Sequence, residues 1–214
     1  MSSDDRPNGH GEATEPDEAT RPKDYRVLDA GALRALAHPL RVQIYDILSQ
    51  YGPQTASSLA ARLGESSGAT SYHLRALAAH DLIREIEGRG TGRERWWERP
   101  KGGVTFANPE AMRTPSGRAA TQLVMAEFFR RRQQQLVDYV NRGIINEPET
   151  WQESSLLSTS TARMTVEQTQ KLGREIQALV DAATDKYRDQ QGEGVRPVTI
   201  RADIFPLPNE GEAS

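Results

Sequence analysis

The chain of 214 residues contains no cysteine, which excludes disulfides, thiolate metal sites and cysteine redox switches. It also lacks any apolar run near the ~20 residues that a membrane-spanning helix needs, and its first residues contain no apolar stretch resembling a secretory signal. Histidine is scarce, at positions 10, 38, 73 and 80 only, so a site built from histidine ligands is hard to assemble. We therefore expect a cytoplasmic protein without metal or cofactor.

Charge is unevenly distributed along the chain. The formal net charge is −3, and 27% of residues are charged against 36% hydrophobic. Residues 1–24 carry seven acidic and three basic side chains, a net −4, and show no hydrophobic period, so they are expected to form a disordered acidic leader. Residues 30–100 carry nine arginines and seven acids, a net +2, which suits a local rather than a general affinity for nucleic acid.

Residues 25–100 show the pattern of three or more helices followed by a β-hairpin. Asp29 is a candidate N-cap, the pair His38-Pro39 interrupts the helix that Asp29 begins, and Gly52-Pro53 ends the next one. Thr55 and Ser66 are candidate caps of two shorter helices. The alternating segment 82–87, the reversal GRGTG and the returning segment 93–99 predict a wing. This order predicts a winged helix-turn-helix domain.

The predicted helix after Ser66 is the best candidate for reading DNA in a major groove. With Thr70, Leu74 and Leu77 turned inward, the outward face and its flank hold the candidate DNA-binding residues Ser67, Gly68, Ser71, Tyr72, His73 and Arg75. A histidine that is partly buried and bonded to the backbone is the alternative for His73. The wing adds Arg89, Arg93 and Arg95, which we expect to contact the DNA backbone or minor groove; a solvated hairpin tip is the alternative.

Beyond Pro100 the chain is expected to form a second region, residues 101–214, for dimerisation and possible binding of an effector. Thr114-Pro115 starts a long helix through about Asn141, whose first half is apolar on more than one side. We therefore expect a homodimer through Leu123, Val124, Phe128 and Phe129; burial within the same chain is the alternative. The arginine run 130–132 reads as a solvated stripe, with a second DNA-backbone contact as the alternative.

The last part of the chain predicts a small strand-helix-strand unit. Residues 154–164 are rich in Ser and Thr, a capping box begins at Thr165, and residues 195–208 alternate apolar and polar side chains before a last few disordered residues. The fold class predicted for the whole chain is mainly α with small β (α+β). We find no catalytic constellation; the glycines of GRGTGR join two wing strands and lack the context of a dinucleotide fingerprint.

Three segments resemble the ArsR-type winged-helix regulators: LRALAHPLRVQIYDIL, SGATSYHLRAL and GRGTGRERWW. The likeness covers about residues 25–100, and is closest to an actinobacterial-like branch with a C-terminal extension. It implies a homodimer that binds an inverted-repeat operator on double-stranded DNA as a repressor and leaves it on receiving a signal. The helix SSGATSYHLRAL lacks the cysteines of the family's metal sensors, so metal sensing is not carried over.

Two functions remain open at this point. The first is a sequence-specific transcription regulator, whose signal is an unknown small-molecule effector, a protein partner or nothing. The second is a winged helix that binds a protein partner without specific DNA binding. The arginine wing favours the first and the overall negative charge slightly favours the second.

Overall fold

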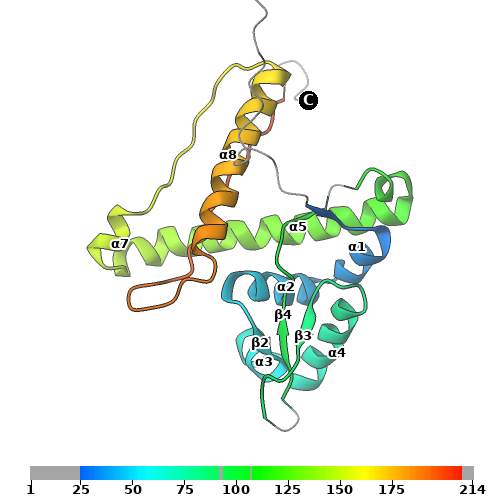
Figure 1. Cartoon of the computed structure of the whole chain (residues 1–214). Coiled ribbons are helices and arrows are strands. Elements are labelled where there is room, and N and C mark those ends of the chain that lie inside the picture. The colour runs from blue at the N-terminus through cyan, green and yellow to red at the C-terminus, as the bar shows by residue number, and fades with distance from the viewer. Residues whose placement is uncertain (1–24, 92–93, 107, 209–214) are drawn as a thin grey trace, which may run out of the picture. The chain divides into compact units, whose positions relative to one another are not determined.

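The computed structural model describes residues 25–91, 94–106 and 108–208. The acidic leader 1–24, Arg93 and the last residues 209–214 lie outside the described residues, so the expectations for them stay predictions. The described chain forms two compact units (Figure 1). One comprises residues 25–161 with Pro197–Thr199, and the other comprises Ala162–Arg196 with residues 200–208. The mainly α fold with small β-sheets agrees with the predicted class.

The first two helices begin and end where the sequence predicts. Helix α1 spans Ala30–Leu36, and the carboxylate of Asp29 accepts a hydrogen bond from the N–H group of Ala32 at 2.8 Å. Helix α2 spans Pro39–Tyr51. His38 caps it, because its Nδ1 atom accepts the N–H of Leu40 at 3.2 Å. Proline at the first helical position thus both ends one helix and begins the next.

Helices α3 (Ala56–Leu63) and α4 (Ser67–Ala78) form the helix-turn-helix pair. Thr55 caps α3 in a reciprocal capping box with Ser58, and Ser66 caps α4 through the N–H of Ala69. Gly64 ends α3 with a φ of 68°, a left-handed conformation that glycine adopts without steric cost. The tight turn packs the two helices against each other.

The wing is a three-stranded antiparallel sheet in the order β2-β4-β3. Strands β2 (Gln54–Thr55), β3 (Arg84–Ile86) and β4 (Trp96–Glu98) are shorter than the alternating pattern suggested. Trp97 is in the core, 7% exposed. Trp96 lies under the guanidinium of Arg89 within the wing.

A second, two-stranded sheet was not anticipated. Strand β1 (Arg26–Val27) pairs in parallel with β5 (Val104–Thr105). The side chain of Asn108 donates a hydrogen bond to the carbonyl of Leu28 at 2.8 Å and tightens this junction. A short 3-10 helix, η2 (Ala111–Arg113), leads to the long helix.

Helix α5 (Pro115–Asp138) is part of the core of the helix-turn-helix unit, because it packs on α1 and α2. Val124 is fully buried, and Phe128 is 7% exposed and stacks with Phe106 at 4.8 Å and edge-on with Tyr45 at 6.3 Å. These two side chains therefore lie inside the chain's own core, which corrects the expectation that they form a dimer interface. The hydrophobic core of this unit therefore includes residues beyond Pro100, the expected end of the domain.

After Phe128 along α5, the contact between α2 and α5 becomes polar. Arg131 donates from Nε to a carboxylate oxygen of Asp46 at 3.1 Å, and both side chains are largely buried. Gln50 donates to the other carboxylate oxygen at 3.1 Å and accepts from Gln135 at 2.9 Å. Arg131 thus belongs to a polar seam rather than to the solvated stripe expected from the sequence.

After α5 the chain turns through short helical pieces. A π-helical turn, η3 (Tyr139–Gly143), is followed by α6 (Ile144–Asn146) and α7 (Glu149–Glu153). None of the residues in these three pieces is buried. The long helix predicted to end near Asn141 therefore loses its regular α-helical hydrogen bonding three residues earlier.

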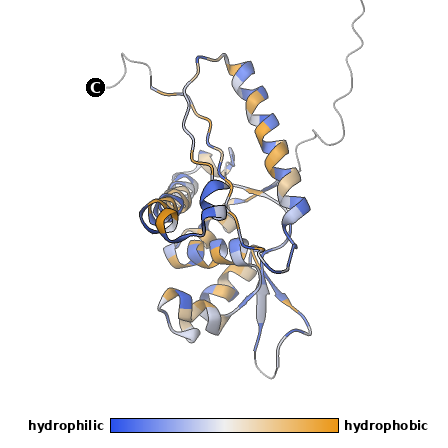
Figure 2. Cartoon of the chain, turned by 90° about the vertical axis from the view of Figure 1, so that its left-hand side faces the viewer, coloured by the Kyte–Doolittle hydropathy of each residue, from blue (hydrophilic) through white to orange (hydrophobic). Residues whose placement is uncertain are grey.

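The C-terminal unit contains helix α8 (Val166–Tyr187), which begins with the predicted capping box between Thr165 and Gln168. Apolar residues recur along this helix (Figure 2), yet none is buried. The two strands expected in segments 154–164 and 195–208 do not form within the described residues. Strands exist only by main-chain pairing with a neighbour, and these extended segments have none.

Candidate nucleic-acid interface

The exposed face of α4 is the candidate reading surface. Thr70, Leu74 and Leu77 are fully buried against the core, as the spacing predicts. This leaves the opposite side to solvent, and it carries four of the predicted residues: Ser67, Gly68, Tyr72 and Arg75. The other two, Ser71 and His73, are half-buried at the flanks of that face. Within the described residues, no ion pair engages the guanidinium of Arg75.

The first turn of α4 is accessible to a ligand. Ser66 satisfies only the N–H of Ala69 with its hydroxyl group, at 3.1 Å. A Cβ atom added at Gly68 would come no closer than 4.0 Å to any neighbour, the hydroxyl oxygen of Ser66. Glycine is therefore not required here by packing within the chain. The N-terminal N–H groups and the helix dipole favour an anion at this end.

A groove runs between the start of α3, the side of α4 and the wing. Its lining combines hydroxyl groups and two arginines with apolar and acidic side chains: Thr55, Ala56, Ser57, Ser67, Ser71, Arg75, Glu94, Arg95 and Trp97. Sequence reasoning missed Ser57. Its position two residues after the capping residue Thr55 places it in the first turn of α3, and that signal was available in the sequence.

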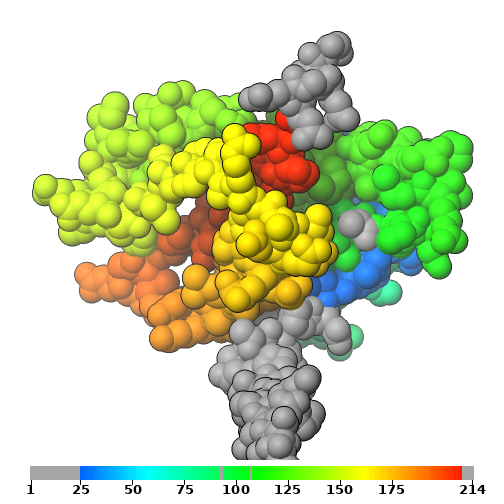
Figure 3. Space-filling model, turned by 90° about the horizontal axis from the view of Figure 1, so that it is seen from above, coloured from blue at the N-terminus to red at the C-terminus, as the bar shows by residue number. Residues whose placement is uncertain are grey.

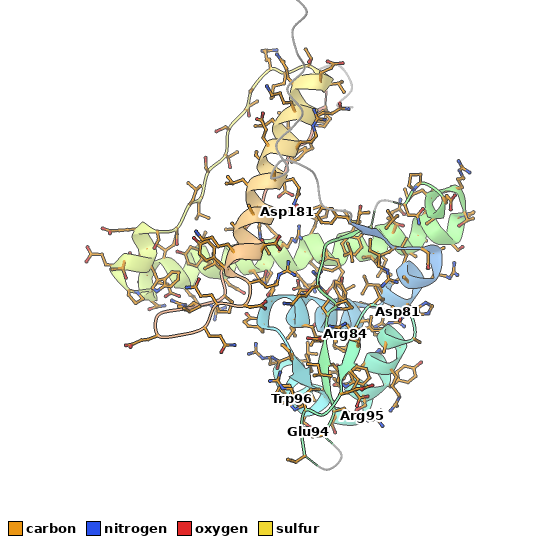
Figure 4. The ribbon with its side chains drawn as sticks, in the orientation of Figure 1. Asp81, Arg84, Glu94, Arg95, Trp96 and Asp181 are labelled. Carbon is orange, nitrogen blue, oxygen red and sulfur yellow. The ribbon has the colours of Figure 1, made fainter. Side chains whose placement is uncertain are left out.

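The wing arginines are held by weak contacts (Figure 4). The guanidinium of Arg89 lies 3.9 Å from the ring centroid of Trp96. Arg95 forms a 3.2 Å ion pair with Glu85, and its side chain remains 65% exposed. Exposed pairs of this kind contribute about 0–1 kcal/mol, so a phosphate group competes with them easily. The structure gives no position for Arg93.

His73 lies behind Tyr72, where the sequence left two alternatives open. Their rings meet edge to face at 5.3 Å, and the His73 ring lies 4.6 Å from that of His38. Burial, His38 and Arg41 together hold the pKa of His73 below its usual value, against the opposing influence of Glu65. The Nδ1 atom of His73 is buried without a hydrogen-bond partner, so the backbone-bonded alternative does not hold for that atom.

The described residues lack two features that mark other classes of protein. No group of three or more His, Cys, Asp or Glu side chains is arranged to hold a metal ion in the part that the structure describes. None of the described helices combines the length and the hydropathy needed to cross a bilayer.

Comparison with known proteins agrees with the geometry of α3 and α4. Residues 36–86 match the model of a protein family described as a helix-turn-helix domain, a stretch that runs from the end of α1 to the end of β3. No curated protein matches the sequence. The match includes the capped α3–α4 pair and the exposed face of α4. Residues 36–86 are therefore a helix-turn-helix domain, the kind of domain that DNA-binding regulators carry.

Proposed function

We propose that the chain is a sequence-specific transcription regulator of the ArsR type that binds an operator as a dimer and acts as a repressor. The observation that carries the proposal is the exposed face of α4. It presents Ser67, Gly68, Tyr72 and Arg75 inside the matched helix-turn-helix domain, beside a groove whose lining includes three serines and two arginines. A helix of this kind fits the ~12 Å width of the major groove.

The two parts of this surface have different roles in the proposal. Arg75 is suited to bidentate contact with guanine, and Ser71 and Tyr72 to base edges or phosphate. Arg89 and Arg95 approach the backbone and the minor groove from the wing, where contact depends on charge and groove shape. The first set gives sequence preference, and the second gives affinity that depends on salt.

The dimer contact is proposed for the outer side of α5. Leu123 is 41% exposed and Phe129 is 49% exposed, on a helix whose other side is fixed in the core. Atoms of α5 reach the molecular surface in Figure 3. Exposed apolar side chains of this size on a helix suit a symmetric contact with a second copy. We further propose that a small-molecule effector binds the protein and causes it to leave the operator.

The test compares operator and random DNA in a salt titration. Operator duplexes are first selected from a random library by the wild-type protein, and affinities are then measured by fluorescence anisotropy. Arg75→Ala is expected to cost about 1–3 kcal/mol per protomer on the operator and little on random DNA. Arg95→Ala is expected to weaken binding to both and to lower the salt slope by about one per lost phosphate contact.

Arg174→Ala, which removes an exposed arginine from α8, is the matched control and should bind as wild type does. If the wild-type protein selects no sequence and neither variant changes binding to any duplex, the proposal fails. The protein-interaction alternative, a winged helix that docks on another protein, then takes its place.

A further inference from the structure

Three basic side chains gather beside Tyr72, on the side of α4 away from the wing. His38 and Arg41 come from the start of α2, and His73 comes from the middle of α4. The rings of His38 and His73 are 4.6 Å apart, and Arg41 is close enough to lower the pKa of His73. Arg41 also interacts electrostatically with Tyr72, which is 63% exposed.

The cluster lacks a directly paired carboxylate. Within the described residues, no ion pair joins Arg41, His38 or His73 to a carboxylate. Glu65 acts electrostatically on His73 without forming such a pair. The Nε atom of Arg41 and the Nδ1 atom of His73 are both buried without a hydrogen-bond partner, although buried polar groups are nearly always satisfied. The charge of Arg41 is therefore available to an anion from outside the chain.

The position of the cluster around α4 indicates that a DNA phosphate group is the anion that binds there. Ser71 faces the groove beside the wing, and Tyr72 lies about 100° further around the helix. Gly68, open to solvent, lies between them. A helix inserted in the major groove has a phosphate backbone on each side of it. The wing and Ser57 lie on the side of one backbone, and the cluster lies on the side of the other.

We propose that Arg41, supported by His38 and His73, forms a second DNA-phosphate site, which contacts the backbone across the groove from the wing. This inference rests on the proposed function and adds a contact that fixes how α4 is oriented in the groove. Arg41 makes the contact beside Tyr72. His73 adds charge when it takes up a proton, whereas the Nδ1 atom of His38 stays an acceptor because it caps α2.

The site makes DNA binding depend on pH. In the free protein, burial and the neighbouring His38 and Arg41 lower the pKa of His73, while Glu65, just before α4, raises it. A phosphate group placed over the cluster favours the protonated ring of His73 and raises its pKa. Binding then takes up protons, so affinity increases as the pH falls from about 8 to about 6, through the ordinary range of histidine.

The first test is a salt titration of Arg41→Gln and Arg41→Lys on operator and random duplexes. Arg41→Gln is expected to weaken binding about tenfold on both and to lower the salt slope by about one per protomer. Arg41→Lys should retain most of the affinity, because the charge stays. Arg174→Gln removes the same charge from an exposed position on α8 and should change neither quantity.

The second test uses the wild-type protein, so it does not depend on how a variant folds. The ring protons of the four histidines are titrated by NMR with and without operator DNA, and the pKa of His73 is expected to rise on binding. Unchanged values, together with wild-type affinity for a folded Arg41→Gln, overturn the phosphate site. If Arg75→Ala still loses operator affinity in that case, the proposed function stands; a wild-type protein that binds no duplex defeats both.

Discussion

Arg131 of α5 donates a hydrogen bond to the buried carboxylate of Asp46 on α2, at 3.1 Å. The pair joins the long helix to the helix-turn-helix unit just beyond the apolar contacts of Phe128. A buried charge is tolerated only when paired and hydrogen-bonded. Gln50 supplies the additional hydrogen bond to Asp46 that this pair needs.

Breaking the pair from one side is expected to cost more than removing it altogether. Arg131→Met leaves the Asp46 carboxylate buried without its cation, and the free energy of unfolding should fall by about 3 kcal/mol. The double variant Asp46→Leu with Arg131→Met should recover much of that loss. Urea denaturation measures both, and Arg132→Met, next to it but exposed, is the control. Additive losses would show that the two residues do not interact.

Substitution of Gly68 should change protein stability and DNA affinity in opposite directions. A methyl group at Gly68 meets nothing within the chain closer than 4.0 Å, so Gly68→Ala should stabilise α4 by about 0.5 kcal/mol through helix propensity. The same methyl group obstructs close approach of DNA, so operator affinity should fall. Gly173→Ala in α8, where nothing lies within 4 Å, is the matched control and should raise stability alone. A Gly68→Ala protein with full operator affinity would place the DNA elsewhere.

Two adjacent phenylalanines of α5 should respond in opposite ways. Phe128 is 7% exposed, and Phe128→Ala should lower the free energy of unfolding by about 3–5 kcal/mol. Phe129 is 49% exposed, and Phe129→Glu should leave the fold intact while converting the proposed dimer to a monomer. Light scattering and thermal denaturation distinguish the two effects. The dimer assignment is wrong if the wild-type protein is itself a monomer at micromolar concentration.

The lowered pKa of His73 predicts a pH dependence of folding in the absence of DNA. A histidine whose pKa is lower in the folded state stays neutral there, while the unfolded chain takes up a proton below about pH 6.5. This residue therefore makes the protein less stable as the pH falls from about 6.5 toward its folded-state pKa. The free energy of unfolding at pH 7.5 and 5.5 should differ less in His73→Gln than in wild type. Equal differences would remove His73 as the cause.

Local signals made the first half of the fold predictable. Asp29, Thr55 and Ser66 act as caps through contacts within three residues, and the His38-Pro39 break depends on the chain geometry at one bond. The inward stripe of α4 follows from helical spacing alone. These features need no knowledge of distant residues, so the exposed face of α4 could be derived from the sequence.

Contacts between distant segments could not be derived in this way. The pairing of Asp46 with Arg131 and the stacking of Phe106 on Phe128 join residues that no local pattern connects. For the same reason, Arg41 was overlooked as a site residue, since its neighbours Tyr72 and His73 meet it only in the folded chain. The alternating segment 195–208 looked like a strand, but alternation does not supply a pairing partner.

The packing of α5 against α1 and α2 limits how evolution and protein engineering can recombine this protein. The stretch that matches the helix-turn-helix family ends at residue 86, yet Phe128 and Arg131 supply one wall of the same core. A graft of residues 36–86 onto another protein would leave Tyr45 without Phe128 and Asp46 without Arg131. The smallest portable DNA-binding module in this chain therefore extends from β1 to the end of α5, about twice the length that the family match suggests.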